Sequence, residues 1–247
     1  MGYVFDFHDA TAYEKWLLKK RHHSIAELEC RLMQEMLKPL KGESILDIGC
    51  GTGASILPLI EMNLDVTGID PSPYMLDIAC RNLGSKVDFH RGFAEDLPFD
   101  DNSFNHASLF TTLEFVDDPE KAIAEAIRVA KDKLFIGVLN RYAIKSIERR
   151  VKGIFTSTIY NRARFFSIWE LKNMIKAIAG PVPVSWRTIC QFPGQSGKLI
   201  GNIGKSGFTK RFPFGAFAGM VITLTPRFNT RLLPLKYRAK SPTGIVA

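Results

Sequence analysis

The chain has 247 residues, 46% of them hydrophobic, a length and composition that fit one α/β domain with insertions. Its cysteines show no Cys-x-x-Cys spacing, which argues against both a disulfide framework and a zinc site. No apolar run is long enough for a bilayer span, and residues 1–7 lack the basic start and apolar stretch of a signal peptide. We therefore expect a cytoplasmic protein that holds no metal.

The net charge of +8 conceals a strong asymmetry between the two halves of the chain. Residues 1–120 carry 10 Lys and Arg against 21 Asp and Glu, a net charge of −11. Residues 121–247 carry 23 against 4, a net charge of +19, and no acidic residue follows Glu170. Two interpretations stay open: the basic half faces an anionic partner, or it complements the acidic half within the fold.

Hydrophobic periodicity predicts alternating helices and strands along the first 140 residues. A helix over 11–38 with a break near 22–24 comes first, and strands are expected at 44–49, 64–69, 87–89, 106–110 and 134–139. Between them lie helices at about 54–62, after Ser72-Pro73 and after Asp118-Pro119, where Ser72 is expected to cap its helix. This alternation predicts a parallel sheet with helices on both faces.

Beyond residue 140 the pattern changes. Residues 141–165 are basic and irregular, and Ser167–Ala179 has the spacing of an amphipathic helix. Strands are expected at 183–192 and 217–224, separated by a loop rich in Gly and Lys at 194–214. A basic tail follows at 226–247. Core packing is the simpler role for the 167–179 helix; binding to an anionic membrane surface is the alternative.

The segment Leu46-Asp-Ile-Gly-Cys-Gly-Thr-Gly53 is the most informative motif. A glycine-rich turn between a strand and a helix lets a ligand approach backbone N–H groups closely. Such a turn could hold a dinucleotide pyrophosphate, but the carboxylate of Asp47 would repel one and favours a cationic ligand. Asp70, at the end of the next strand, can accept hydrogen bonds from both hydroxyls of a ribose, which fits either ligand.

Four motifs in the same order resemble the class I S-adenosylmethionine (SAM)-dependent methyltransferases, particularly the ubiquinone-, menaquinone- and biotin-pathway enzymes. They are the glycine segment 46–53, Gly-Ile-Asp-Pro-Ser-Pro-Tyr-Met-Leu at 68–76, Ala-Glu-Asp-Leu-Pro-Phe at 94–99 with Asp-Asn-Ser-Phe at 101–104, and Leu-Glu-Phe-Val-Asp-Asp-Pro-Glu-Lys-Ala at 113–122. The resemblance covers about residues 10–180. It implies a Rossmann-like three-layer sandwich, with a mostly parallel seven-stranded sheet that ends in an antiparallel hairpin.

The same resemblance implies a division of the chain into functional parts. Residues 1–42 would form a helical cap, 43–140 the cofactor-binding core, 141–225 an acceptor-side insertion with the C-terminal hairpin, and 226–247 a tail. SAM would be the cofactor, and its binding residues would be Tyr13, Trp16, Asp47, Gly49, Cys50, Gly51, Gly53, Asp70, Met75, Ala94, Glu95, Thr111 and Glu114. Thr112 would lie beside the sulfonium end with Thr111.

Two further sets of residues bear on the site. Where the family has Asp or Asn before its Ala-Glu pair, this chain has Phe93, so Glu95 or Asp96 would replace that contact to the adenine. Leu139-Asn140-Arg141 resembles a segment of the quinone-pathway enzymes, so Asn140 and Arg141 either line the acceptor site or serve as a cap and a surface charge. His8, His22 and His23 of the cap could serve as a general base, but solvent exposure is the simpler expectation for them, and we assign no catalytic base.

The function expected is therefore methyl transfer from SAM to a small acceptor, acidic or amphiphilic in character. An NAD(P)-dependent oxidoreductase on the same topology is one alternative, and Asp47 disfavours it. A non-catalytic SAM-fold protein that binds nucleic acid is another, but the aromatic-plus-basic motifs of RNA readers are missing. Peripheral contact with an anionic membrane is expected through the basic half. The sequence identifies neither the acceptor, nor the methylated atom, nor the oligomeric state.

Overall fold

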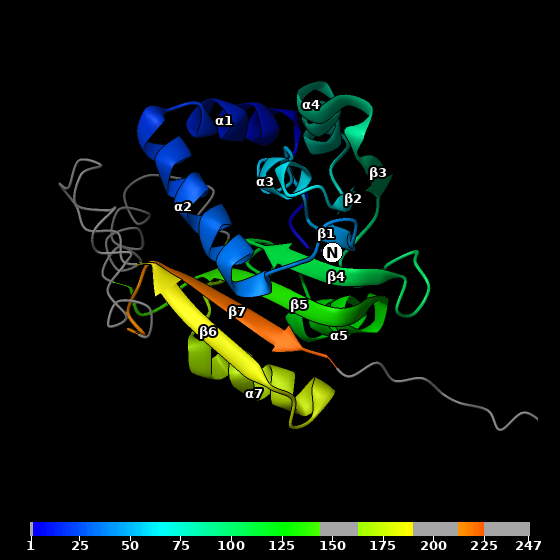
Figure 1. Cartoon of the computed structure of the whole chain (residues 1–247). Coiled ribbons are helices and arrows are strands. Elements are labelled where there is room, and N and C mark those ends of the chain that lie inside the picture. Colours follow the sequence, from blue (N-terminus) through cyan, green and yellow to red (C-terminus); the bar gives the residue numbers. More distant parts are fainter. Residues whose placement is uncertain (1, 144–162, 190–211, 225–247) are drawn as a thin grey trace, which may run out of the picture.

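The computed structural model describes residues 2–143, 163–189 and 212–224. Its strands are β1 (Ser44–Ile48), β2 (Asp65–Asp70), β3 (Asp88–Arg91), β4 (Phe104–Phe110), β5 (Ala130–Leu139), β6 (Val184–Ile189) and β7 (Phe217–Thr223). They form a seven-stranded sheet in the order β3-β2-β1-β4-β5-β7-β6 (Figure 1). The first five strands pair in parallel, whereas β7 runs antiparallel to both of its neighbours. The predicted fold class is therefore confirmed.

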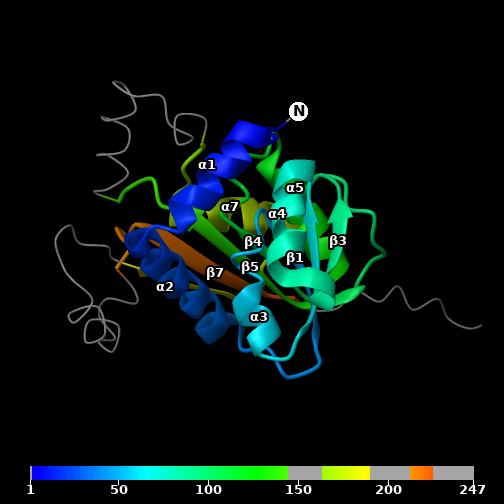
Figure 2. The ribbon, with the colours of Figure 1, turned by 90° about the horizontal axis from the view of Figure 1, so that it is seen from above.

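Helices cover both faces of this sheet. They are α1 (Phe7–Leu17), α2 (Lys20–Leu37), α3 (Leu57–Glu61), α4 (Pro73–Leu83), α5 (Pro119–Val129) and α7 (Ile168–Ala179), and a short 3₁₀ turn, Gly84–Lys86, follows α4. One core packs the sheet against α5 and α7, and a second packs it against α2 and α3. Figure 2 shows α2 and α3 on the same side of β5 and β7. In Figure 1, α1 extends from α2 to α4, and it contacts both.

Three helices begin with a side-chain cap: the sequence predicted those at Ser72 and Asp118, and the structure adds the one at Ser167. The side chains of Ser72, Asp118 and Ser167 each accept a hydrogen bond from a backbone N–H in the first turn of the helix that follows. At α7, Glu170 completes a capping box. The apolar face of α7 is buried against the sheet and α5, which is the core-packing role. That face is therefore not available to a membrane.

The N-terminal cap differs from the prediction. The helix expected over 11–38 is two helices, and the break lies at Leu18–Lys19, before the predicted position at 22–24. Lys19 adopts an extended backbone conformation between Leu18 and Lys20, both residues with good helix propensity, so no local breaker marks the site. The break allows the imidazole of His22 to stack on the indole of Trp16 and places Nδ1 of His22 2.9 Å from the Trp16 carbonyl oxygen. The helix predicted at 54–62 is likewise shorter, because residues 53–56 form turns.

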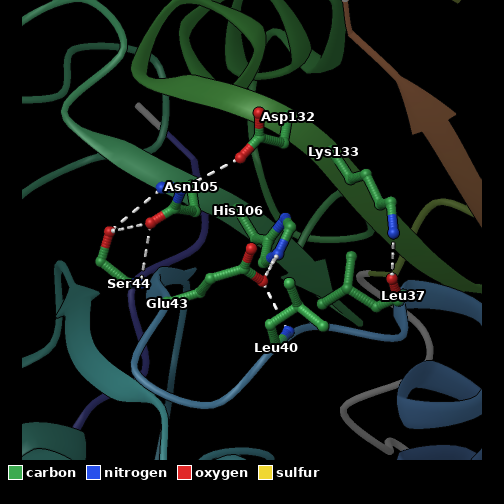
Figure 3. Close-up of polar contacts among 8 residues, drawn as sticks. All are labelled: Leu37, Leu40, Glu43, Ser44, Asn105, His106, Asp132 and Lys133. Atoms are coloured by element: carbon green, nitrogen blue, oxygen red, sulfur yellow. Dashed lines mark hydrogen bonds and ion pairs between the residues drawn. The ribbon is translucent and has the colours of Figure 1, made fainter.

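A polar network anchors the segment that joins α2 to β1 (Figure 3). Glu43 Oε2 accepts hydrogen bonds from the Leu40 N–H at 2.6 Å and from Nε2 of His106 at 2.8 Å. Nζ of Lys133 donates to the Leu37 carbonyl at 2.7 Å. Asn105 joins Ser44 to Asp132 through its side-chain amide. We call this network the amino edge, because it lies where the parallel strands β1, β4 and β5 begin.

Candidate active site

The glycine loop at the carboxyl end of β1 has a backbone that other residues rarely adopt. Gly49 and Gly51 have φ values of +71° and +53°. A Cβ on Gly49 would lie 2.3 Å from Cγ2 of Thr112, whereas a Cβ on Gly51 would meet nothing within 4 Å. Gly49 is therefore required by close packing, and Gly51 leaves space on the open side of the loop.

Asp70, at the carboxyl end of β2, is fixed against this loop. Its carboxylate accepts hydrogen bonds from the N–H groups of Gly51 and Ser72, each at 2.9 Å. Burial raises the pKa of this carboxyl above its ordinary value, and these two hydrogen bonds only partly offset that effect. The loop and the carboxylate thus form one preorganised unit.

Asp47 lies beneath the loop rather than on the surface of the site. Its side chain is fully buried, and its two oxygens accept hydrogen bonds from the hydroxyls of Ser55 and Ser108, each at 2.6 Å. Burial raises its pKa to about 6, although both serines lower it. Its carboxylate stabilises the loop from below, so any effect on a ligand is electrostatic.

Two threonines and a buried glutamate follow β4. Thr111 has φ +52°, an unusual conformation for a β-branched residue, and strain of this kind often accompanies function. The Thr112 hydroxyl donates to the Ile48 carbonyl at 2.7 Å. Glu114 accepts the Leu139 N–H at 2.6 Å, while its other oxygen has no hydrogen-bond partner in the described structure. Burial raises the pKa of Glu114 to about 8.

An N-terminal segment closes the site from above. The Tyr3 N–H donates to the Phe115 carbonyl at 2.8 Å, and the Ser72 hydroxyl donates to the Phe5 carbonyl at 2.6 Å. These contacts hold residues 2–5 across the loops that follow β2 and β4. No local sequence pattern predicts these contacts, because the partners of residues 3 and 5 lie about 110 and 70 residues away.

A cavity of about 710 Å³ lies between the loops and the cap formed by residues 2–5, α1 and α2. Ten of the predicted binding residues line it: Tyr13, Trp16, Gly49, Cys50, Gly51, Asp70, Met75, Ala94, Glu95 and Thr111. Three do not, namely Asp47, Gly53 and Glu114. Side chains that the sequence did not indicate also line it, namely Phe5, Ile25, Glu29, Phe110 and Phe115, and so does His22, for which solvent exposure was the simpler expectation. For three of them, His22, Ile25 and Glu29, the sequence does contain a usable pattern, because their helical spacing places them on one face of α2.

Of the residues expected near the adenine and near the acceptor, only some line the cavity. Phe93 and Glu95 both line the cavity, but Glu95 also accepts the Asp117 N–H at 3.0 Å, which ties two loops together. Asp96 does not line it. Asn140 is buried and donates to the Pro213 and Gly215 carbonyls, while Arg141 pairs with Glu170 at 2.8 Å. Asn140 and Arg141 thus serve the structural roles considered for them.

The chemistry of the cavity suits a cationic nucleoside ligand better than a pyrophosphate. No Lys or Arg of the described residues lines it, whereas Glu29, Asp70 and Glu95 do. Two further buried acids, Asp47 and Glu114, lie behind its walls with raised pKa values. A cation would relieve this burial of negative charge, and a pyrophosphate would increase it. The described residues also contain no group of three or more His, Cys, Asp and Glu that could hold a metal ion.

Comparisons with known proteins agree with this class of site. The family model of the methyltransferase domain matches residues 46–135. An uncharacterized protein of Methanocaldococcus jannaschii is 34% identical over 179 residues, which are 71% of this chain and 80% of that protein. The crystal structure of a Thermotoga maritima SAM-dependent methyltransferase, described as a possible histamine N-methyltransferase, superposes with a TM-score of 0.68 and 28% identity. That match covers 88% of this chain and 96% of the other.

The demethylmenaquinone methyltransferase of Renibacterium salmoninarum is 39% identical over 101 residues. This match covers 41% of the chain and 42% of that enzyme, so it spans less than half of either protein. The chain belongs to the class I SAM-dependent methyltransferases. The methyl donor of this family is SAM.

Proposed function

We propose that this protein transfers a methyl group from SAM to a small-molecule acceptor that binds under the α1–α2 cap. One observation carries the proposal: a single cavity joins the glycine loop and Asp70 to the aromatic inner face of the cap. A cofactor and a second small molecule can therefore meet in one cavity. A protein contributes to this reaction mainly by orienting the two reactants and by excluding water from between them.

The residues of the chain have distinct parts in this proposal. SAM supplies a methyl carbon activated by positively charged sulfur. Asp70 would accept the ribose hydroxyls, and the open face of Gly51 would admit the methionine portion, with Asp47 beneath adding negative potential. Met75 and Ala94, both buried, would bound the adenine. Tyr13 and Trp16, which stack on each other with centroids 5.8 Å apart, would cover the cofactor from the cap.

Calorimetric titration with SAM, and separately with NADH, tests the cofactor. We expect micromolar affinity for SAM and a loss of about 100-fold in Asp70→Ala, since a charged acceptor of two hydrogen bonds contributes roughly 3 kcal/mol. Asp65→Ala is the matched control, because Asp65 begins the same strand at its opposite end and is exposed. Binding of NADH in preference to SAM would instead support the oxidoreductase.

The location of the enzyme is a finer part of the proposal. We propose a cytoplasmic protein that contacts anionic membranes from outside the bilayer; no helix in the described ranges is long and apolar enough to cross one. Four exposed aromatic side chains support this contact. They form two pairs of touching rings, Tyr142 with Trp169 and Phe212 with Phe214. The sequences that follow Tyr142 and precede Phe212 are rich in Lys and Arg. Aromatic rings beside basic residues suit an anionic interface.

Co-sedimentation with vesicles tests the membrane contact. At low salt we expect binding to vesicles that contain roughly 30–40% phosphatidylserine. Added salt should weaken this binding, and so should the double variant Phe212→Ser with Phe214→Ser. Neutral phosphatidylcholine vesicles are the control. The tail predicted at 226–247 and most of the 194–214 loop lie outside the described residues, so vesicle binding is measured on the full chain. No sedimentation with the anionic vesicles at low salt would refute the contact.

A further inference from the structure

A continuous row of aromatic rings lines the cap side of the cavity and ends at a histidine. Phe115 contacts Phe5 edge-on at 5.2 Å between centroids, and Phe5 contacts Tyr13 in the same way at 6.3 Å. Tyr13 then stacks on Trp16. The last contact in the row is the stack of Trp16 on His22, at 4.1 Å with an angle of 14° between the rings. All five residues line the cavity.

The position of His22 determines which of its nitrogens can react. Nδ1 lies 2.9 Å from the carbonyl oxygen of Trp16. A carbonyl oxygen only accepts hydrogen bonds, so Nδ1 carries a hydrogen whether the ring is neutral or charged. In the neutral ring, Nε2 therefore holds the lone pair. The neighbouring His23 is different: its side chain is 69% exposed and pairs with Glu27.

The charged side chains on the described wall of this cavity, His22 itself aside, are acidic. Apart from His22, the ionisable side chains on the cavity wall are Tyr3, Tyr13, Glu29, Cys30, Cys50, Asp70 and Glu95. Three of these are carboxylic acids, and no Lys or Arg of the described residues is among them. Lys19 and Lys20, three and two residues before His22 in the chain, are exposed. An imidazolium stacked on indole gains a cation–π interaction as well.

We propose that Nε2 of His22 accepts the proton released when an uncharged acceptor with an N–H or O–H group is methylated. This rests on the proposed function. The new bond joins the acceptor's nitrogen or oxygen to the methyl carbon, and the carbon–sulfur bond breaks with its electron pair going to sulfur. The electron pair of the N–H or O–H bond stays on the acceptor atom. The proton moves to Nε2, and the positive charge of the sulfonium is transferred to the imidazolium.

The same residues indicate the class of acceptor. The row of rings, together with Ile25 and Leu139, offers flat apolar surface, and the acidic wall repels an anion. We therefore infer an uncharged, ring-containing acceptor. The described cavity wall provides no cation for the acidic acceptor that the basic half of the sequence suggested.

The test uses the full chain with ¹⁵N-labelled histidine and two-bond proton–nitrogen NMR spectra. The His22 signals are assigned by their loss in His22→Gln, and His23→Gln is the matched control. With bound S-adenosylhomocysteine (SAH), we expect the tautomer with hydrogen on Nδ1. We then add three probes of similar size, namely phenol, aniline and benzoate. Phenol and aniline should shift the Nε2 signal, and benzoate should require at least tenfold higher concentration for the same shift.

Three results would overturn the inference: a hydrogen on Nε2 of the neutral ring, no response of Nε2 to phenol or aniline, or an equal response to benzoate. Calorimetry with SAH on the same samples separates this failure from that of the proposed function. If SAH does not bind, the methyltransferase proposal fails. If SAH binds and any of the three results is seen, only the role of His22 fails. Circular dichroism of both variants establishes that they are folded.

Discussion

The acidic groups at the two edges of the parallel sheet have pKa shifts of opposite sign. At the amino edge, burial alone would raise the pKa of Glu43, but the Leu40 N–H and His106 outweigh burial and lower it. At the carboxyl edge, burial prevails, and the pKa values of Asp47, Asp70 and Glu114 are all raised. At the amino edge the donors outweigh burial; at the carboxyl edge the donors to Asp47 and Asp70 do not, and no Lys or Arg of the described residues lines the cavity there.

The opposite pKa shifts indicate that the amino edge contributes mainly to the stability of the fold and the carboxyl edge mainly to ligand binding. A paired acid stabilises the fold, whereas a buried acid with a raised pKa destabilises the fold when ionised and can be relieved by a cationic ligand. Proteins depart from the rules of stability mainly where they function. The carboxyl edge is therefore the expected location of cofactor binding, and the amino edge the anchor of the cap. Substitutions at the two edges should have different effects on unfolding and on SAM affinity.

The largest effect on stability is expected at the amino edge. Glu43→Ala removes the acceptor for the Leu40 N–H and leaves the buried ring of His106 without its partner, which should cost about 3 kcal/mol in free energy of unfolding. SAM affinity of the folded protein should change less than threefold. Urea unfolding and calorimetry measure the two quantities, with the exposed Glu61→Ala as the control. A large loss of affinity with unchanged stability would contradict the separation.

At the carboxyl edge, Glu114→Gln should stabilise the protein at high pH. The pKa of Glu114 is about 8 in the fold against an ordinary 4.5, so between these values the folded state binds a proton that the unfolded state has lost. Stability from this group is present below pH 4.5 and falls as pH rises toward 8, by at most about 1.4 kcal/mol per pH unit. The amide should remove most of that fall, and urea unfolding at pH 5 and pH 8 measures it.

Glu43 should give the opposite pH dependence. Its pKa is lowered, so its stabilisation is present above its ordinary pKa and is lost as pH falls through the folded value. Glu61→Gln is the control for both acids. If Glu114→Gln left the difference between pH 5 and pH 8 unchanged, the group would not be the source of the pH dependence.

A smaller effect is expected from Lys133→Met. The variant keeps the length of the side chain but loses the hydrogen bond to the Leu37 carbonyl at the last turn of α2. We expect a loss of about 1 kcal/mol, from one hydrogen bond at a helix end, and no change in SAM affinity. Lys131→Met on the same strand is the control. An unfolding midpoint equal to that of the control would show that the contact adds nothing.

Local features of this protein could be predicted from the sequence, and distant contacts could not. The glycine loop, Asp70 and the cap of α4 by Ser72 each depend on neighbouring residues, so their patterns are visible in the chain. The amino edge joins Glu43 to His106 across 63 residues, and no short pattern records that contact. His22 was expected to be exposed for a different reason: its stack on Trp16, only six residues away, depends on a helix break at Leu18–Lys19 that the sequence pattern placed later.

The position of the antiparallel strand β7 has a consequence for folding during synthesis on the ribosome. It lies between β5 and β6 and supplies hydrogen bonds to both, although it follows them in the chain. As the ribosome makes this protein, β6 has no neighbouring strand, and β5 keeps one open flank, until residues 217–223 emerge. Unpaired flanks of this kind attract other strands. A nascent chain halted before residue 217 would therefore be prone to aggregate, even with its cofactor loop complete.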